Sequence, residues 1–146
     1  MTAEAIYREL KARGHKLTPQ RELIISVLLN ATGPMTAQAI FEAVARQHPH
    51  ISFDTVYRNL GLLTDLGLVN RIRLKTKFSC YYEIAGKHRH HLVCLGCGAS
   101  FPLAYCPFEG VADRLQKQGS FRIVDHAFEI YGYCRLCDRQ SRPGCK

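Results

Sequence analysis

Two Cys-x-x-Cys pairs constrain this chain more than any other feature. Cys94 and Cys97 form the first pair, Cys134 and Cys137 form the second, and 36 residues separate the two pairs. Each pair can turn two sulfurs toward one point, so two pairs complete the tetrahedral shell that zinc prefers. A single pair would also suit a thioredoxin-like redox motif, and two pairs of buried free thiols are the purely structural alternative. The spacing favours a closed structural zinc site, which has no open position for catalysis.

Composition favours the same interpretation of the cysteines. No apolar run approaches the roughly 18 to 20 residues of a membrane span, and Glu4, Arg8 and Glu9 stand where a signal peptide needs apolar residues. We therefore expect a cytoplasmic protein, in which so many cysteines, seven among 146 residues, favour metal ligation over disulfides. A net charge of +8 would attract a polyanion without distinguishing nucleic acid from an anionic membrane or an acidic protein.

A histidine cluster directly precedes the first cysteine pair. In the run 88–91, the alternation of a strand places His88 and His90 on one face. Two histidines are half of a site for zinc, iron, manganese or nickel, and Glu109 and His126 are available downstream to complete it. The alternative is a solvated polar edge without metal.

The amino-terminal half has the pattern of four short helices. Apolar spacing predicts helices over 3–12, 19–30, 37 to about 47, and 53–66. Thr18, Thr36 and Ser52 are the expected N-caps of the last three, and Gly67 is the expected left-handed residue after the fourth.

A predicted hairpin follows these helices, with strands over 69–74 and 78–84 and a turn at 75–77. Helices followed by such a hairpin are typical of a winged helix-turn-helix, whose last helix lies in the DNA major groove. Near the start of that helix, where base edges are reached, stand Thr55, Tyr57, Arg58 and Asn59. Basic side chains expected at phosphates are Lys16, Arg21, Arg71, Arg73, Lys75 and Lys77. A helical bundle with a solvated basic face is the alternative.

The carboxy-terminal half is predicted to form a small sheet. Strands are expected over 90–94, 100–103 and 121–133, with an amphipathic helix over 108–118. A sheet this small leaves an open edge, which a second copy of the chain would cover by two-fold pairing. We predict an α+β fold, Cys106 as a small buried hydrophobe, and no assigned role for Cys145.

Several of these motifs together resemble the ferric uptake regulator family over about residues 3–138. The motifs are the run 15–21, the helix 54–60, the cluster 88–91 leading into the first cysteine pair, and the second pair. Intact cysteine pairs and Cys80 on the expected wing strand are most similar to the zinc uptake regulators. The resemblance implies a winged-helix DNA-binding domain (1–84), a hinge (85–87) and a metal-binding dimerisation domain (88–146).

Site residues follow from the resemblance by position. Structural zinc would be held by Cys94, Cys97, Cys134 and Cys137, and a regulatory metal by His88, His90, Glu109 and His126. A hinge site would draw on Cys80, Glu83 and His91, although Arg89 and Pro34 stand where many members have histidine. Tyr57 and Arg58 would read DNA with Ser52 and Thr55 beside them, supported by Lys16 and Arg21.

The resulting prediction is a zinc-responsive repressor. It would bind palindromic double-stranded operator DNA as a homodimer, control metal uptake genes, and hold one structural Zn²⁺ and at least one regulatory Zn²⁺ per subunit. The same architecture sensing iron or peroxide is an alternative, and so is a DNA-binding protein whose zinc is purely structural. We expect no enzyme, membrane partner or small-molecule substrate. His88-Arg89-His90 lacks the glutamate of a zinc deaminase, and there is no P-loop or dinucleotide loop.

Overall fold

The computed structural model describes residues 1–77, 80–86 and 88–141 and divides into two compact units, Met1–Lys87 and His88–Lys146. The expected hinge, 85–87, falls at the end of the first unit, and its last residue lies outside the described residues. Among the described residues, no helix is long and apolar enough to cross a membrane.

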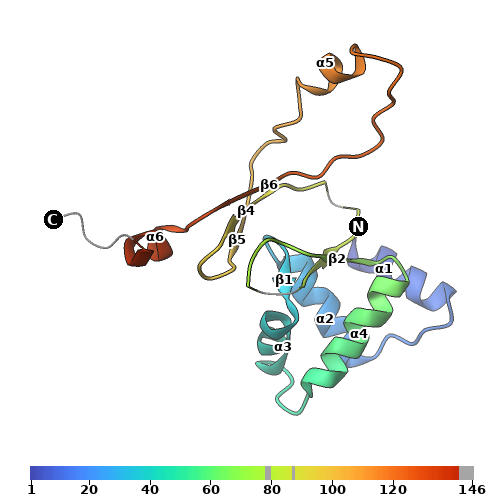
Figure 1. Cartoon of the computed structure of the whole chain (residues 1–146). Coiled ribbons are helices and arrows are strands. Elements are labelled where there is room, and N and C mark those ends of the chain that lie inside the picture. Colours follow the sequence, from blue (N-terminus) through green and yellow to red (C-terminus); the bar gives the residue numbers. More distant parts are fainter. Residues whose placement is uncertain (78–79, 87, 142–146) are drawn as a thin grey trace. The chain divides into compact units, whose positions relative to one another are not determined.

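The first unit contains four capped helices (Figure 1): α1 (Ala3–Ala12), α2 (Pro19–Asn30), α3 (Ala37–Ala45) and α4 (Phe53–Asp65). The hydroxyl groups of Thr18, Thr36 and Ser52 accept hydrogen bonds from backbone N–H groups three residues later, at 3.3, 3.1 and 3.1 Å. All three predicted N-caps are therefore confirmed. α4 ends one residue earlier than predicted, and Gly67 follows with a φ of 69°, the left-handed conformation expected there.

A small antiparallel sheet completes this unit. Its strands are β1 (Met35–Thr36), β2 (Val69–Ile72) and β3 (Tyr81–Ile84), in the order β1-β3-β2. β2 and β3 form the predicted wing in shortened form, and residues 78–79 of the expected second strand lie outside the described residues. The sequence does not predict β1, because it has only two residues, the second of which is the N-cap of α3, and so short a segment has no detectable alternation.

The helices and the wing enclose one apolar core. Ile6, Ile24, Ile40, Leu60 and Ile84 come from five different elements and are each no more than 1% exposed. In α2 the buried residues are Ile24, Ile25 and Leu28, whereas Leu23 and Val27 are only partly buried. This core fixes α4 on the wing and leaves the start of the helix exposed.

The second unit is built on a three-stranded sheet in the order β5-β4-β6. β4 (His91–Cys94) pairs antiparallel with β5 (Ser100–Pro102) and parallel with β6 (Glu129–Gly132). Two short helices, α5 (Ala112–Gln116) and α6 (Arg135–Ser141), complete it. The long connection from β5 to β6 carries α5 (Figure 1).

Two predictions for this unit were wrong in extent. The strand expected over 121–133 is limited to β6, and residues 121–128 form no regular structure. The helix expected over 108–118 shrinks to α5, which has no side-chain N-cap. Val111 and Leu115 remain 43% and 41% exposed, so this single chain supplies little of the packing that would extend the helix.

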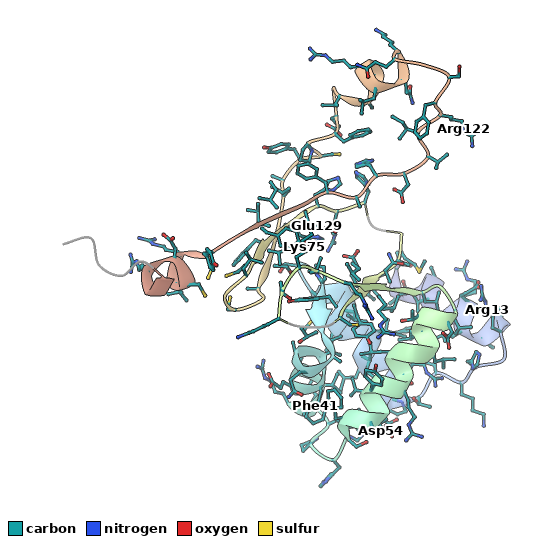
Figure 2. The ribbon with its side chains drawn as sticks, viewed as in Figure 1. Arg13, Phe41, Asp54, Lys75, Arg122 and Glu129 are labelled. Carbon is teal, nitrogen blue, oxygen red and sulfur yellow. The ribbon has the colours of Figure 1, made fainter. Side chains whose placement is uncertain are left out.

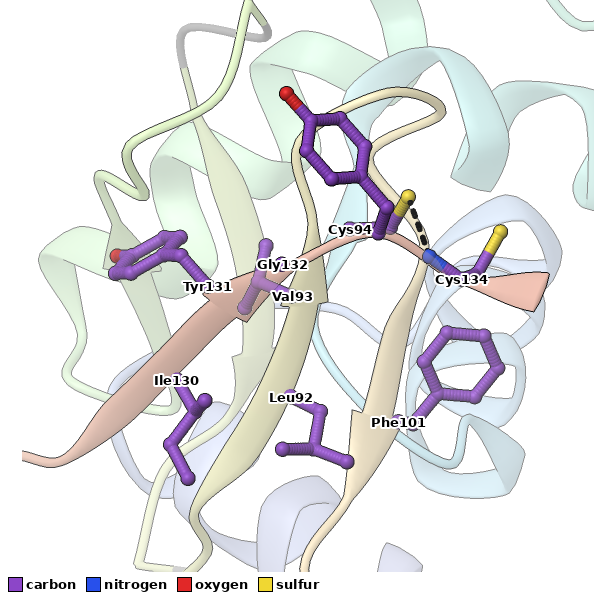
Figure 3. A pocket seen from close by; sticks show the side chains of 9 residues that line it. Leu92, Val93, Cys94, Phe101, Ile130, Tyr131, Gly132 and Cys134 are labelled. Carbon is purple, nitrogen blue, oxygen red and sulfur yellow. Dashed lines mark hydrogen bonds between the residues drawn. The ribbon is translucent and has the colours of Figure 1, made fainter. Parts of the chain in front are cut away.

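One face of this sheet exposes apolar side chains. Leu92 of β4 lies between Phe101 of β5 and Ile130 of β6, and the three are 39%, 45% and 43% exposed. Figure 3 shows these side chains lining a shallow cavity of ≈ 190 Å³. We call these three residues the apolar row.

Candidate metal centres and DNA-reading helix

The four predicted structural-zinc cysteines meet at one end of the second sheet. Cys94 ends β4, Cys97 lies in the turn that follows, and Cys134 and Cys137 lie immediately before and within α6. The four sulfur atoms lie within 4.8 Å of one another. Gly96 is required between them, since a Cβ there would come within 2.8 Å of the Cys137 sulfur.

Hydrogen bonds polarise this cysteine cluster. The backbone N–H of Cys134 donates to the Cys94 sulfur at 3.2 Å (Figure 3). This bond, with further N–H donors of Cys97 and Gly96, lowers the pKa of Cys94 to about 6. The hydrogen bond with Cys134, together with burial, raises the pKa of Cys137 to about 12. These effects favour the thiolate at Cys94 and the thiol at Cys137, so a divalent cation that binds all four sulfurs would displace the Cys137 proton.

A second cluster gathers His88, His90, Cys106 and His126, whose donor atoms also lie within 4.8 Å of one another. The Nε2 atom of His90 lies 3.2 Å from the Nε2 atoms of both His88 and His126 and 3.2 Å from the Cys106 sulfur. The Cys106 sulfur lies 3.4 Å from His88 Nε2 and 3.3 Å from His126 Nε2.

These distances can be compared with those of a tetrahedral zinc site. Zn–N bonds of about 2.05 Å and a Zn–S bond of about 2.3 Å give N···N edges of about 3.3 Å and N···S edges of about 3.6 Å in a tetrahedron. The measured separations of 3.2–3.4 Å are close to both values. The three histidines and the cysteine therefore fit one tetrahedral ion.

Neighbouring groups orient two of these ligands. The Nδ1 atom of His90 lies 3.3 Å from the carbonyl oxygen of Phe128, so an Nδ1–H can donate there and leave the Nε2 lone pair facing the cluster. The ring of His126 stacks on Phe108 with centroids 4.4 Å apart. The ring contact and the hydrogen bond limit the rotation of both imidazoles.

The structure changes one member of the predicted regulatory set. His88, His90 and His126 come together as expected, but Glu109 is exposed and is not among the donors of the cluster. Its place is taken by Cys106, three residues earlier, which is half-buried rather than the buried hydrophobe we expected. The sequence signal that could have identified Cys106 as a ligand is that it belongs to neither Cys-x-x-Cys pair and so had no partner assigned.

The residues expected at the hinge divide between the units. Cys80 and Glu83 belong to the first unit and His91 to the second, so this metal site remains a prediction. The Cys80 sulfur accepts a hydrogen bond from Arg71 Nε at 3.2 Å. His91 is buried, and its Nε2 atom has no hydrogen-bond partner among the described residues. Burial, followed by the electrostatic effects of Arg89 and His90, lowers the pKa of His91 and so favours its neutral form.

All the residues predicted to contact DNA lie in the first unit, and those at the start of α4 are Ser52, Thr55, Tyr57, Arg58 and Asn59. The Ser52 hydroxyl caps α4 and lies 2.8 Å from the Thr55 hydroxyl. Arg58 and Asp54 form an exposed ion pair of 2.9 Å, and Figure 2 shows Asp54 near the first turn of α4. The capping role of Ser52 leaves less of its hydroxyl for DNA than the sequence suggested.

Tyr57 is held from two sides while remaining 46% exposed. Its ring stacks on Phe53 with centroids 6.2 Å apart, and Phe53 in turn makes an edge contact with Phe41 of α3, labelled in Figure 2. Tyr57 and Tyr82 of β3 line the same hollow, and the pKa of Tyr82 is raised first by burial and then by its interaction with Tyr57. Tyr57 is therefore presented in one orientation between the reading helix and the wing.

Comparison with known proteins assigns the chain to a family. The model of the ferric uptake regulator family matches residues 12–131. The ferric uptake regulation protein of Bacillus subtilis is 35% identical over 139 residues, covering 92% of this chain and 93% of the relative. The peroxide operon regulator of the same organism is 30% identical and covers 90% of both chains. The structure of the Helicobacter pylori ferric uptake regulator, described as revealing three functional metal-binding sites, superposes with a TM-score of 0.78 at 26% identity, covering 99% of this chain and 97% of that one.

A family match over this much of the chain, with the winged helix and the two metal-ligand clusters, shows that the protein belongs to the ferric uptake regulator family, whose members are metal-responsive, DNA-binding homodimeric transcription regulators and not enzymes.

Proposed function

We propose that this protein is a zinc-responsive repressor that binds palindromic operators and controls metal uptake genes. The observation that carries the proposal is the donor set of the second cluster, three imidazoles and one thiolate. Zinc accepts nitrogen and sulfur ligands in tetrahedral geometry, whereas manganese prefers oxygen ligands in octahedral sites, and a thiolate shifts selectivity toward the softer ion. Cys106 is therefore the residue that favours zinc over iron or manganese.

The cluster can couple metal binding to the shape of the second unit. His88 and His90 lie directly before β4, whereas Cys106 and His126 lie near the two ends of the long connection between β5 and β6. One ion bound to all four would therefore link the segment before β4 to both ends of this connection. Without metal, the connection over 104–128 has little regular structure of its own to hold it. We propose that zinc binding orders the connection over 104–128 and thereby stabilises the dimer. The dimer in turn sets the distance between the two α4 helices that contact DNA.

The apolar row supports the dimer. Leu92, Phe101 and Ile130 are large side chains on adjacent strands, and a second copy would remove them from water. In a two-fold dimer the α4 helices would be separated by about one helical turn of DNA, roughly 34 Å, or a multiple of it. A coupling free energy of about 3 kcal/mol, at the upper end of the usual range, would change operator affinity more than a hundredfold.

Metal-dependent binding to a selected duplex tests the proposal. A palindromic duplex is first selected from a random pool by the purified dimer with Zn²⁺, and affinity is then measured by fluorescence anisotropy at buffered free Zn²⁺, Fe²⁺ and Mn²⁺. We expect zinc to support binding at the lowest free concentration. If DNA affinity depends on the free concentration of Fe²⁺ or Mn²⁺ and does not depend on that of Zn²⁺, the zinc assignment is wrong and the protein senses another metal.

Iron or peroxide sensing is the second candidate, because the two Bacillus relatives are named for ferric uptake and for the peroxide operon. A metal site formed by the three histidines and the Glu109 carboxylate, without Cys106, would favour iron or peroxide sensing. A third possibility, zinc with a purely structural role, predicts that His90→Ala leaves metal-dependent DNA binding unchanged. The proposal predicts the opposite, namely that His90→Ala abolishes the response while the four-cysteine site keeps its zinc.

A further inference from the structure

We propose that Asn59 is a positioning residue for DNA binding: it holds the Arg21 guanidinium for one backbone phosphate and does not itself read a base. From the sequence, Asn59 was expected near the base edges with Thr55, Tyr57 and Arg58. The inference depends on DNA binding alone and not on which metal the protein senses.

Both polar ends of the Asn59 side chain are used inside the protein. Its Nδ2 group donates to the carbonyl oxygen of Thr55 at 2.8 Å, one turn earlier in α4. Its Oδ1 atom accepts a hydrogen bond from Arg21 Nε at 3.0 Å, and the residue is half-buried. Recognition of adenine by asparagine needs the same oxygen and the same amide group in a fork. Asn59 would have to break two hydrogen bonds to read a base.

Arg21 is fixed at two points by these contacts. Besides the bond to Asn59, its Nη1 group donates to the carbonyl oxygen of Lys16. The side chain is therefore tied both to the segment that leads into α2 and to α4, which is 38 residues away in sequence. An arginine carries five N–H donors, so these two bonds leave donors for a phosphate.

The surroundings of Arg21 fit a phosphate. Arg21, Thr55, Arg58, Asn59 and Leu62 line a hollow of ≈ 230 Å³ on the first unit. The guanidinium groups of Arg21 and Arg58 carry more N–H donors than their present partners use, since Arg58 pairs with Asp54 through Nε, so both retain donors for one anionic group. Because most contacts between protein and DNA go to the backbone, a positively charged hollow beside the reading helix fits a phosphate rather than a base edge.

Fixing Arg21 before DNA arrives removes part of the cost of binding. Ordering a long side chain at an interface costs about 0.5–1.5 kcal/mol, which corresponds to roughly a two- to twelvefold change in affinity. Asn59→Ala should therefore weaken binding of the selected duplex about three- to tenfold. Arg21→Ala, which removes the phosphate contact itself, should in addition lower the slope of log affinity against log salt concentration by about one.

A double-mutant cycle with Arg21→Ala provides the test, using the full-length dimer, the fluorescein-labelled selected duplex and the metal used for its selection. We expect Asn59→Ala to have no further effect once Arg21 is absent, and the ratio of affinities for the selected and a scrambled duplex to stay unchanged. Asn30→Ala is the matched control, because Asn30 makes the same bond to a backbone carbonyl one turn earlier, Ser26, and contacts no arginine in the described residues. The affinity of the Asn30→Ala variant for the selected duplex should equal that of the unmodified protein.

Three outcomes would overturn the inference. Additive effects of the two substitutions would show that Asn59 acts independently of Arg21. A loss of discrimination with an unchanged salt slope would show that Asn59 reads a base, and unchanged binding by Asn59→Ala would show that it does neither. Thermal melting verifies folding, and Asn59→Leu, which keeps the side-chain volume, replaces the alanine variant if that one melts early.

Discussion

Replacing Cys106 with serine tests which residue completes the histidine cluster. A four-ligand zinc site in a small domain binds with an apparent free energy of about 10–16 kcal/mol, or about 2.5–4 kcal/mol per ligand when divided evenly. The structure gives the cluster four ligands, of which Cys106 is one. Its loss should therefore weaken zinc binding at this site roughly 60- to 700-fold, at 1.4 kcal/mol per factor of ten.

Chelator competition measures this effect. Protein loaded with two zinc ions per chain is titrated against a chromogenic chelator, and the four-cysteine site serves as the internal reference because Cys106 is not part of it. The matched control is Glu109→Gln, a substitution of an exposed residue outside the cluster, which should change zinc affinity less than about threefold. If Glu109→Gln weakens zinc binding more than Cys106→Ser, the carboxylate is the ligand and the assignment of Cys106 is wrong.

Cobalt substitution adds a second readout for Cys106. A thiolate bound to Co²⁺ produces a charge-transfer absorption band that imidazole and carboxylate ligands lack. With the four-cysteine site kept filled by zinc, cobalt added to the second cluster should show this band in the unmodified protein and not in Cys106→Ser.

Three further predictions concern the other parts of the site. Gly96→Ala should make the four-cysteine site lose its zinc on mild chelation, because the new methyl group would lie 2.8 Å from the Cys137 sulfur. The control Gly119→Ala should keep its zinc, because a Cβ at that position meets no atom within 4 Å. In the presence of a chelator and a reductant, the free energy of unfolding should rise from pH 6 to pH 9. The pKa of Cys94 is about 6 in the folded protein and 9.0 in the unfolded chain, so in this range the unfolded chain binds more protons. Urea titrations at several pH values should show a smaller rise for Cys94→Ser. Tyr82→Phe should weaken operator binding about three- to tenfold with a shift of only a few degrees in melting temperature, because it removes a hydroxyl that interacts with Tyr57 in the hollow that both line. Unchanged anisotropy titrations would refute this role.

The local elements of the first unit could be predicted because their signals are local. A threonine or serine hydroxyl bonds an N–H three residues later, and a glycine takes the left-handed conformation after a helix, so caps such as Thr18 and Ser52 mark boundaries wherever the chain goes. β1 could not be predicted in the same way. Met35 and Thr36 form a strand only because Tyr82 and Tyr81 lie opposite them, some 45 residues later in sequence.

The second unit shows the limit of periodicity. Residues 121–128 alternate well enough to suggest a strand, yet the parallel partner β4 is only four residues long, and β6 matches it residue for residue. A strand extends only as far as a neighbour offers hydrogen bonds, so the length of β6 is a property of the sheet.

Local patterns were enough to locate the two cysteine pairs, the N-caps of α2, α3 and α4, and the histidines that begin a metal site, because these depend on contacts over two to four residues. Long-range packing was needed to bring Cys106 rather than Glu109 to His126, and to place Asn59 of α4 beside Arg21 of α2. In both cases the outcome depends on the path of a long connection or on the packing of separate helices. Such contacts join positions that no local hydrogen-bond pattern or hydrophobic period relates.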